Sequence, residues 1–145
     1  MSYGEPSVDL MITEYNRNPV HNYVMDDFTV SRHEGNFICG DDIDVYLRIE
    51  DGIIREWSFA GNTGSVTTAA ASLLAEMITD KTLDEVMEWG YDTIAGAGLN
   101  VLPRRRRAAV IALLATRNAI HSFRGDQNTD GTQILIEEFE DLLDD

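Results

Sequence analysis

Residues 43–52 read IDVYLRIEDG, a pattern that organises the sequence on either side of it. Apolar and polar side chains alternate strictly over the first eight residues, which is typical of a strand with one buried face. Asp51-Gly52 is a strong hairpin-turn signal, and Ile53–Phe59 is then the return strand. A weaker alternation over Phe28–Asn36 predicts a strand before them. Three consecutive strands form an antiparallel meander, which needs helices on one face.

Segments with helical spacing of apolar residues flank these strands. Thr82 and Glu85 form a capping-box pattern, and Ser7 is a candidate N-cap for the first helix. The predicted helices are Ser7–Arg17, Val66–Thr79, one from Thr82 to about Ile94, Arg104–Phe123 and Thr132–Leu143. Because strands and helices are segregated along the chain, we expect an α+β fold, a three-stranded antiparallel meander packed against several helices.

The chain is long enough for one domain. We expect that domain to span residues 1–124. Residues 125–145 are then a polar linker and an acidic helix, which packs on the domain or extends from it.

Composition limits the classes of function. The 145 residues carry a formal net charge of −15, which disfavours binding to nucleic acid or to an anionic membrane surface. A single cysteine rules out a disulfide within the chain, so a reducing compartment is expected. Met1–Gly4 shows no secretory leader, and no apolar run is long enough to cross a bilayer. The sequence therefore predicts a soluble, cytoplasmic protein.

That cysteine, Cys39, is followed by Gly40, Asp41 and Asp42 at the entrance of the central strand. A lone cysteine is most often a buried small apolar residue. Here the adjacent carboxylates also suggest a reactive thiol with hard oxygen neighbours. A mononuclear zinc site takes about four ligands, more than this segment provides.

Arg104, Arg105, Arg106 and Arg107 form the one basic cluster in an acidic chain. Four cations at a helix N-terminus oppose the helix dipole, so we expect an anionic group to compensate them. The protein's own carboxylates or an acidic partner fit better than nucleic acid.

Two other features carry weak signals. Gly61–Ser65 precedes a predicted helix but lacks the lysine of a phosphate-binding loop, so we interpret it as a hinge. His21, His33 and His121 are scattered and are expected on the surface or in loops.

The order and spacing of several motifs resemble the U-type iron–sulfur cluster scaffold family, which comprises IscU, SufU and the N-terminal domain of NifU. The resemblance covers about Tyr15 to Phe123. Its motifs are Tyr15-Asn16-Arg17-Asn18-Pro19-Val20-His21-Asn22, Cys39-Gly40-Asp41, Phe59-Ala60-Gly61, Ala69 with Ser72, Lys81-Thr82-Leu83-Asp84-Glu85, and Leu102-Pro103 with Arg105.

The resemblance implies a non-enzymatic scaffold that receives sulfur from a cysteine desulfurase, together with iron, and passes on the assembled cluster. In this family three cysteines and an aspartate converge on one exposed corner. Cys39 and Asp41 match two of these positions, as metal ligands or, for Cys39, as a persulfide acceptor. The other two cysteine positions fall on Gly64 (or Thr63, depending on the spacing) and near Ala108.

Since a cluster takes four ligands, typically cysteines, the resemblance leaves three interpretations open. In the first, the chain is a variant scaffold or carrier of iron or a cluster, and a homodimer or a partner supplies further ligands. In the second, it is an adaptor or regulator of cluster assembly that binds no metal. In the third, Cys39 carries a persulfide, its thiolate favoured by Arg104–Arg107 and opposed by Asp41 and Asp42.

Overall fold

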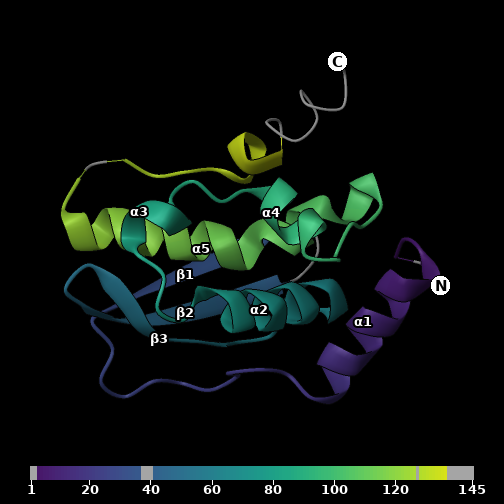
Figure 1. The fold of residues 1–145 in the computed structure, drawn as a ribbon, viewed down its shortest axis with the longest axis horizontal. Coiled ribbons are helices and arrows are strands. Elements are labelled where there is room, and N and C mark those ends of the chain that lie inside the picture. The colour runs from purple at the N-terminus through teal and green to yellow at the C-terminus, as the bar shows by residue number, and fades with distance from the viewer. Residues whose placement is uncertain (1–2, 37–40, 127, 137–145) are drawn as a thin grey trace.

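A three-stranded antiparallel sheet lies at the centre of the protein, in the order β1-β2-β3 (Figure 1). The computed structural model describes residues 3–36, 41–126 and 128–136. Its strands are β1 (Val30–Asn36), β2 (Asp41–Glu50) and β3 (Ile53–Ala60). The predicted meander is therefore confirmed.

The alternation along β2 has its expected physical basis. Ile43, Val45 and Leu47 are fully buried and form part of the core beneath the helices. Asp51 and Gly52 both adopt positive φ, 55° and 73°, as a tight turn matched to the twist of a hairpin requires. The local pattern thus sets both the buried face and the turn.

Helices cover one face of the sheet, with α2 and α5 side by side against it (Figure 1). Trp57 of β3 joins the two layers, since its indole N–H donates to the Thr116 hydroxyl of α5 at 2.9 Å. The helical elements are α1 (Pro6–Arg17), α2 (Ser65–Ile78), α3 (Leu83–Val86), α4 (Tyr91–Gly96), the 3₁₀ turn η1 (Pro103–Arg105) and α5 (Arg106–Arg124).

The prediction of one helix from Thr82 to about Ile94 was wrong. The Thr82 hydroxyl does accept from the Glu85 N–H at 3.1 Å, as the capping pattern predicts. The helix nevertheless ends at Val86, and Gly90 is extended, with φ −143° and ψ −162°. The Trp89 carbonyl accepts from Arg117 of α5 at 2.8 Å, so a tertiary contact takes the place of the next helical turn.

Other helix boundaries differ slightly from the prediction. Glu5, not Ser7, occupies the N-cap position of α1, because Pro6 already belongs to the helix. The last long helix opens with the 3₁₀ turn η1 before α5 begins at Arg106.

The connector after α1 runs along the outer edge of β3. The Phe59 N–H donates to the His21 carbonyl at 3.0 Å, and the Tyr23 hydroxyl donates to Glu56 at 2.5 Å. Burial, together with this hydrogen bond, raises the pKa of Tyr23 to about 12. The connector therefore shields an edge that would otherwise present unpaired backbone groups.

After α5 the chain turns at Gly125 and runs back along that helix (Figure 1). Residues 132–136 are helical, which agrees with the predicted start at Thr132; the rest of the predicted helix, 137–143, lies outside the described residues. Leu135 is 1% exposed and joins the core.

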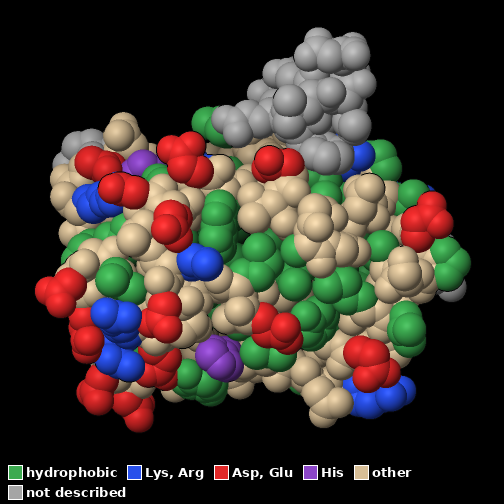
Figure 2. Space-filling model, in the orientation of Figure 1, with side chains coloured by type: hydrophobic (Ala, Val, Ile, Leu, Met, Phe, Trp, Pro, Cys, Tyr) green, Lys and Arg blue, Asp and Glu red, His purple; other side chains and the backbone are tan. Residues whose placement is uncertain are grey.

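The surface reflects the composition. Figure 2 shows acidic side chains dispersed over the visible face. Within the described ranges, no helix is both long and apolar enough to cross a bilayer.

Candidate functional site

A cavity of about 230 Å³ lies where the start of β2 meets the N-termini of α2 and the α5 region. It gathers five of the residues singled out in the sequence from three separate segments. Its lining residues are Asp41, Gly64, Ser65, Val66, Arg104, Arg105 and Ala108.

Asp41 is the anchor of this cavity. Its side chain is 5% exposed, and both carboxylate oxygens are engaged. The Gly64 N–H donates to one oxygen, and the Thr67 hydroxyl donates to the other at 2.9 Å. Gly64 has no side chain with which to cap α2, so a carboxylate from β2 caps that helix instead. A negative charge at this end also complements the helix dipole.

Gly64 and Ala108 bring backbone and a methyl group to the cavity, and neither side chain offers a ligand atom. A Cβ atom built on Gly64 would lie 3.0 Å from Asp41 Oδ1, and the Gly64 φ of −71° is open to any residue. A side chain at position 64 would therefore contact Asp41 directly. Thr63, the alternative position, pairs its hydroxyl with that of Thr68 at 2.7 Å.

The hinge before α2 depends on Gly61. Its φ is 120°, and a Cβ there would collide with the Asp42 carbonyl. Only glycine fits, and this close approach brings the N-terminus of α2 to the start of β2.

The four arginines do not form one patch. Arg104 and Arg105 line the cavity, and Arg105 also stacks over Tyr3, with 5.4 Å between its Cζ and the ring centroid. Arg106 stacks over Tyr91 at 5.3 Å, and Arg107 lines a second cavity of about 170 Å³. Successive residues of a helix point about 100° apart, so a run of four divides among different neighbours.

Tyr91 anchors this end of α5. Burial raises the pKa of its hydroxyl, and the hydrogen bond with the Val101 backbone and the nearby Arg106 partly oppose that rise. The hydroxyl accepts from the Val101 N–H at 2.9 Å.

Asp42 and the histidines lie away from this cavity. Asp42 is exposed and contacts His33 Nε2 at 3.3 Å, while His33 Nδ1 lies 3.0 Å from Asp44. His21 bonds to the Trp57 carbonyl, and His121 faces Asp126 and Asp130.

Cys39 lies outside the described residues, between the paired residues Asn36 and Asp41. Among the residues that are described, no three histidine, cysteine or acidic side chains gather as they would around a metal ion.

Sequence reasoning missed Thr67 as a site residue, although it lies near the start of the predicted helix Val66–Thr79. Its position in the first turn of the helix was the available signal, because a hydroxyl there reaches neighbouring caps. Its hydroxyl also lies 3.4 Å from the Ala108 carbonyl, which links all three segments.

Comparisons with known proteins agree with the fold. The family model "NifU-like N terminal domain" matches residues 9–130. The iron–sulfur cluster assembly scaffold protein IscU of Thermotoga maritima is 37% identical over 62 residues, or 43% of this chain and 44% of that protein. The iron–sulfur cluster assembly protein IscU of Plasmodium falciparum is 29% identical over 125 residues, or 74% of this chain and 76% of that protein.

Two solved structures share the architecture. The N-terminal part of a NifU-like protein from Brucella abortus has a TM-score of 0.66 at 16% identity and covers 79% of this chain and 92% of that one. A SUF-system scaffold, described as putative, from Fervidobacterium islandicum has a TM-score of 0.67 at 17% identity, with 76% and 93% covered. At these identities the likeness shows the fold alone. Because the family match spans most of the chain and the fold agrees with it, this protein belongs to the family of NifU-like N-terminal domains.

Proposed function

We propose that this protein acts in iron–sulfur cluster assembly, as a non-enzymatic acceptor or carrier that works with a cysteine desulfurase in the cytoplasm. Family membership and the names of its relatives support this role. The observation that carries the proposal is the cavity, because it joins Asp41 to Gly64 and Ala108, the positions matched to the family's ligands.

Cys39 is the proposed point of entry for sulfur or iron. The Cys39 thiolate attacks the outer sulfur of the desulfurase persulfide, which forms a persulfide on Cys39 and releases the desulfurase cysteine as a thiolate. Alternatively, the Cys39 thiolate binds iron together with Asp41. Two donors already hold the Asp41 carboxylate, but a carboxylate has about four lone-pair sites. Asp41 therefore keeps acceptor capacity for a metal while it caps α2.

The charge of the cavity favours anionic cargo. Arg104 and Arg105 stabilise a thiolate or persulfide nearby, and they oppose a bare cation. Since Gly64 and Ala108 supply no ligand atoms, a second copy of the chain or a partner completes the coordination of a bound cluster.

Anaerobic reconstitution with iron, sulfide and a cysteine desulfurase supplied with its substrate cysteine tests this role. The wild-type protein should acquire iron and visible cluster absorbance, or a persulfide on Cys39 detected by mass spectrometry. Cys39→Ser should lose both. A wild-type protein that acquires neither iron nor persulfide would overturn the proposal.

A gain of ligands tests the geometry separately. Gly64→Cys with Ala108→Cys should raise the amount of cluster bound per chain, because both new thiols face the cavity that holds Asp41. Gly96→Cys with Ser122→Cys adds two thiols elsewhere and serves as the matched control. Equal cluster content in the two double variants would show that this cavity is not the assembly site.

A further inference from the structure

Asp41 and Asp130 are both shielded from solvent, but the groups that donate to their carboxylates differ in charge. Asp41 is 5% exposed and accepts from the Gly64 N–H and the Thr67 hydroxyl, which are both neutral. Neutral donors satisfy the oxygens of an ionised carboxylate but leave its negative charge in place. Asp41 therefore keeps its attraction for a cation.

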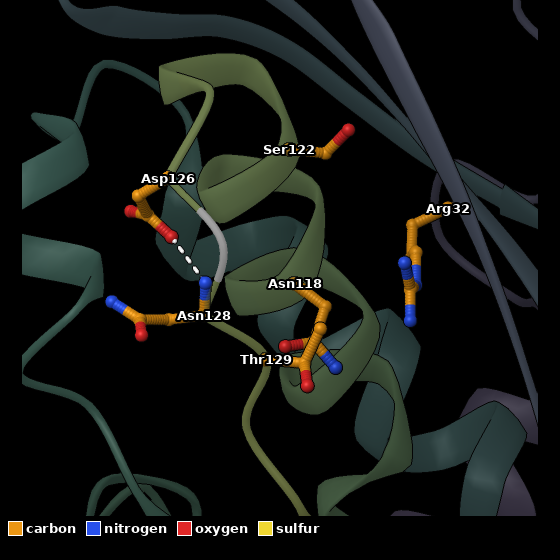
Figure 3. Close-up of a pocket in the computed structure, with 6 residues that line it drawn as sticks. All are labelled: Arg32, Asn118, Ser122, Asp126, Asn128 and Thr129. Carbon is orange, nitrogen blue, oxygen red and sulfur yellow. Dashed lines mark hydrogen bonds between the residues drawn. The ribbon is translucent and has the colours of Figure 1, made fainter.

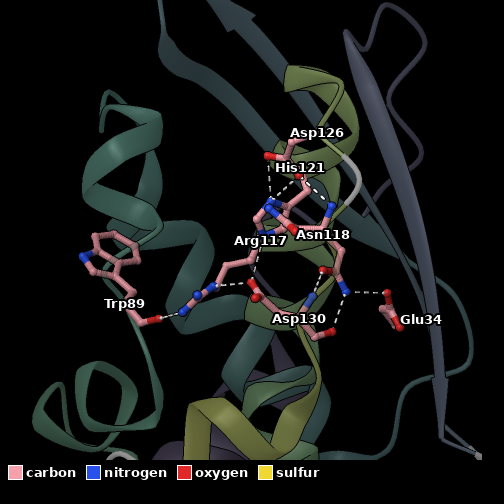
Figure 4. Close-up of polar contacts among 8 residues, drawn as sticks. Glu34, Trp89, Arg117, Asn118, His121, Asp126 and Asp130 are labelled. Atoms are coloured by element: carbon pink, nitrogen blue, oxygen red, sulfur yellow. Dashed lines mark hydrogen bonds and ion pairs between the residues drawn. The ribbon is translucent and has the colours of Figure 1, made fainter.

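Asp130 belongs to the C-terminal segment, defined as residues 126 and 128–136, and shows the contrasting arrangement (Figure 4). Its carboxylate accepts from Arg117 Nε at 2.8 Å, and the same oxygen lies 3.2 Å from His121 Nε2. The guanidinium compensates the charge of this carboxylate. We therefore interpret Asp130 as part of a structural ion pair.

The contacts of Asp130 lie toward the C-terminus of α5, away from the helix start that borders the Asp41 cavity. A cavity of about 230 Å³ opens there beside Asn118, with a different lining from that of the Asp41 cavity (Figure 3). Its lining residues are Arg32, Asn118, Ser122, Asp126, Asn128 and Thr129. A substitution beside Asp41 therefore leaves this polar cluster in place.

Thr67 is placed to fix the orientation of the Asp41 carboxylate. It is 1% exposed and is the third residue of α2. The terminal torsion of an aspartate is broad, so its donors set the plane of the carboxylate. The Gly64 N–H binds one oxygen and the Thr67 hydroxyl binds the other. Because β-branching restricts χ1 of threonine, this hydroxyl is a well-defined donor.

The Thr67 hydroxyl leaves Asp41 able to bind a ligand. A hydroxyl has one hydrogen, and the 2.9 Å contact with Asp41 is shorter than the 3.4 Å contact with the Ala108 carbonyl. With one donor on each oxygen, each oxygen keeps a further lone-pair site. Asp41 lines the cavity, so these sites are available to a ligand there.

We propose that Thr67 is a positioning residue, which holds the Asp41 carboxylate in the orientation that binds a metal ion in this cavity. The inference rests on the proposed function, because it requires a metal at Asp41. Thr67 acts through Asp41 and does not contact the metal. Loss of a donor to a ligating carboxylate typically lowers metal affinity by about 10–100-fold.

Titration of the full-length, reduced protein with Co²⁺ tests this role. Thiolate-to-cobalt absorbance reports binding at Cys39, and surface carboxylates alone do not produce it. Thr67→Val removes the hydroxyl, keeps the shape of the side chain, and should raise the Co²⁺ dissociation constant about tenfold. Thr67→Ser keeps the hydroxyl and should bind within about twofold of the wild type. Arg104 and Arg105 are unchanged in every variant, so their repulsion of a cation cancels in the comparison.

A double-mutant cycle separates positioning from stability. In an Asp41→Asn background, Thr67→Val should change the dissociation constant by less than about twofold, because no carboxylate remains to be oriented. Thr116→Val is the matched control, since the Thr116 hydroxyl is also buried and its partner is Trp57, outside the cavity. It should lower the midpoint of thermal unfolding without changing Co²⁺ binding.

The outcomes distinguish this inference from the proposed function. If Thr67→Val binds Co²⁺ as tightly as the wild type, or if Thr116→Val loses as much affinity, the positioning role is overturned and the role in cluster assembly stands. A wild-type protein without thiolate-to-cobalt absorbance would overturn metal binding through Asp41 and Thr67 together. Persulfide formation on Cys39 would still support the proposed function in that case.

Discussion

At the scale of single residues, Asp41 has two roles that the sequence presents as one. The resemblance marks it as a ligand beside Cys39, and the structure also makes it the cap of α2. Its two hydrogen bonds join β2 to a helix more than twenty positions later in the chain. A change at this position therefore alters stability and ligand capacity together, and the two effects have to be measured separately.

We expect Asp41→Asn to lower the free energy of unfolding by about 1–3 kcal/mol, the usual cost of losing a hydrogen bond to a buried charged group. Asparagine still accepts from the Gly64 N–H, but its amide group faces the Thr67 hydroxyl. Urea unfolding followed by circular dichroism measures the difference. Asp42→Asn is the matched control, since Asp42 is the exposed neighbour on the same strand. Equal effects of the two substitutions would contradict the capping role.

At the scale of elements, the segment between α2 and α5 shows how tertiary contacts override a local pattern. The Thr82 cap forms as predicted, yet the helix stops after one turn. The Trp89 carbonyl accepts a hydrogen bond from Arg117. The Gly90 N–H donates to the Thr93 hydroxyl at 3.1 Å, and this bond lies at the start of α4. Two short helices, α3 and α4, therefore take the place of the one predicted helix.

Thr82→Ala should lower the free energy of unfolding by about 1 kcal/mol, because the Glu85 N–H loses its side-chain acceptor. Thr82→Ser keeps the hydroxyl and should cost much less. Thermal and urea unfolding of the two variants, side by side, measure the contribution of the cap. A serine variant as unstable as the alanine variant would instead assign the effect to the lost methyl group.

At the scale of the whole molecule, we propose that the C-terminal segment folds with the domain that precedes it. Leu135 lies in the same core as the sheet and helices, and the Asp130 contacts fix the chain to α5. In this proposal, residues 1–124 and the C-terminal segment after them, which the sequence analysis described separately, belong to one folding unit.

Leu135→Ala should lower the free energy of unfolding by about 2–5 kcal/mol, the range for a leucine truncated in a core. Ile134→Ala is the matched control, because Ile134 is 47% exposed and should change stability little. Fluorescence and circular dichroism should report one coincident transition for the wild type. Two separate transitions, or a Leu135→Ala variant with the same free energy of unfolding as the wild type, would mean that the segment folds independently.

The sequence predicted the sheet well, because its signals are local. Strand alternation and the Asp51-Gly52 turn involve residues within a few positions of one another, and the fold follows them. The candidate site was only partly predictable. Motif resemblance pointed to Asp41, Gly64 and Ala108, but not to Thr67, which joins these segments through hydrogen bonds.

By itself, the sequence determined the three-stranded meander, the buried face of β2 and the family to which the chain belongs. Only the tertiary structure decided that Asp41 caps α2, that the four arginines divide among two cavities and the ring of Tyr91, and that His121 faces two carboxylates. The physical reason is the separation along the chain over which each kind of interaction acts. Periodicity and turn chemistry act between near neighbours, whereas these contacts form only when the fold brings separate backbone segments to fixed distances and angles.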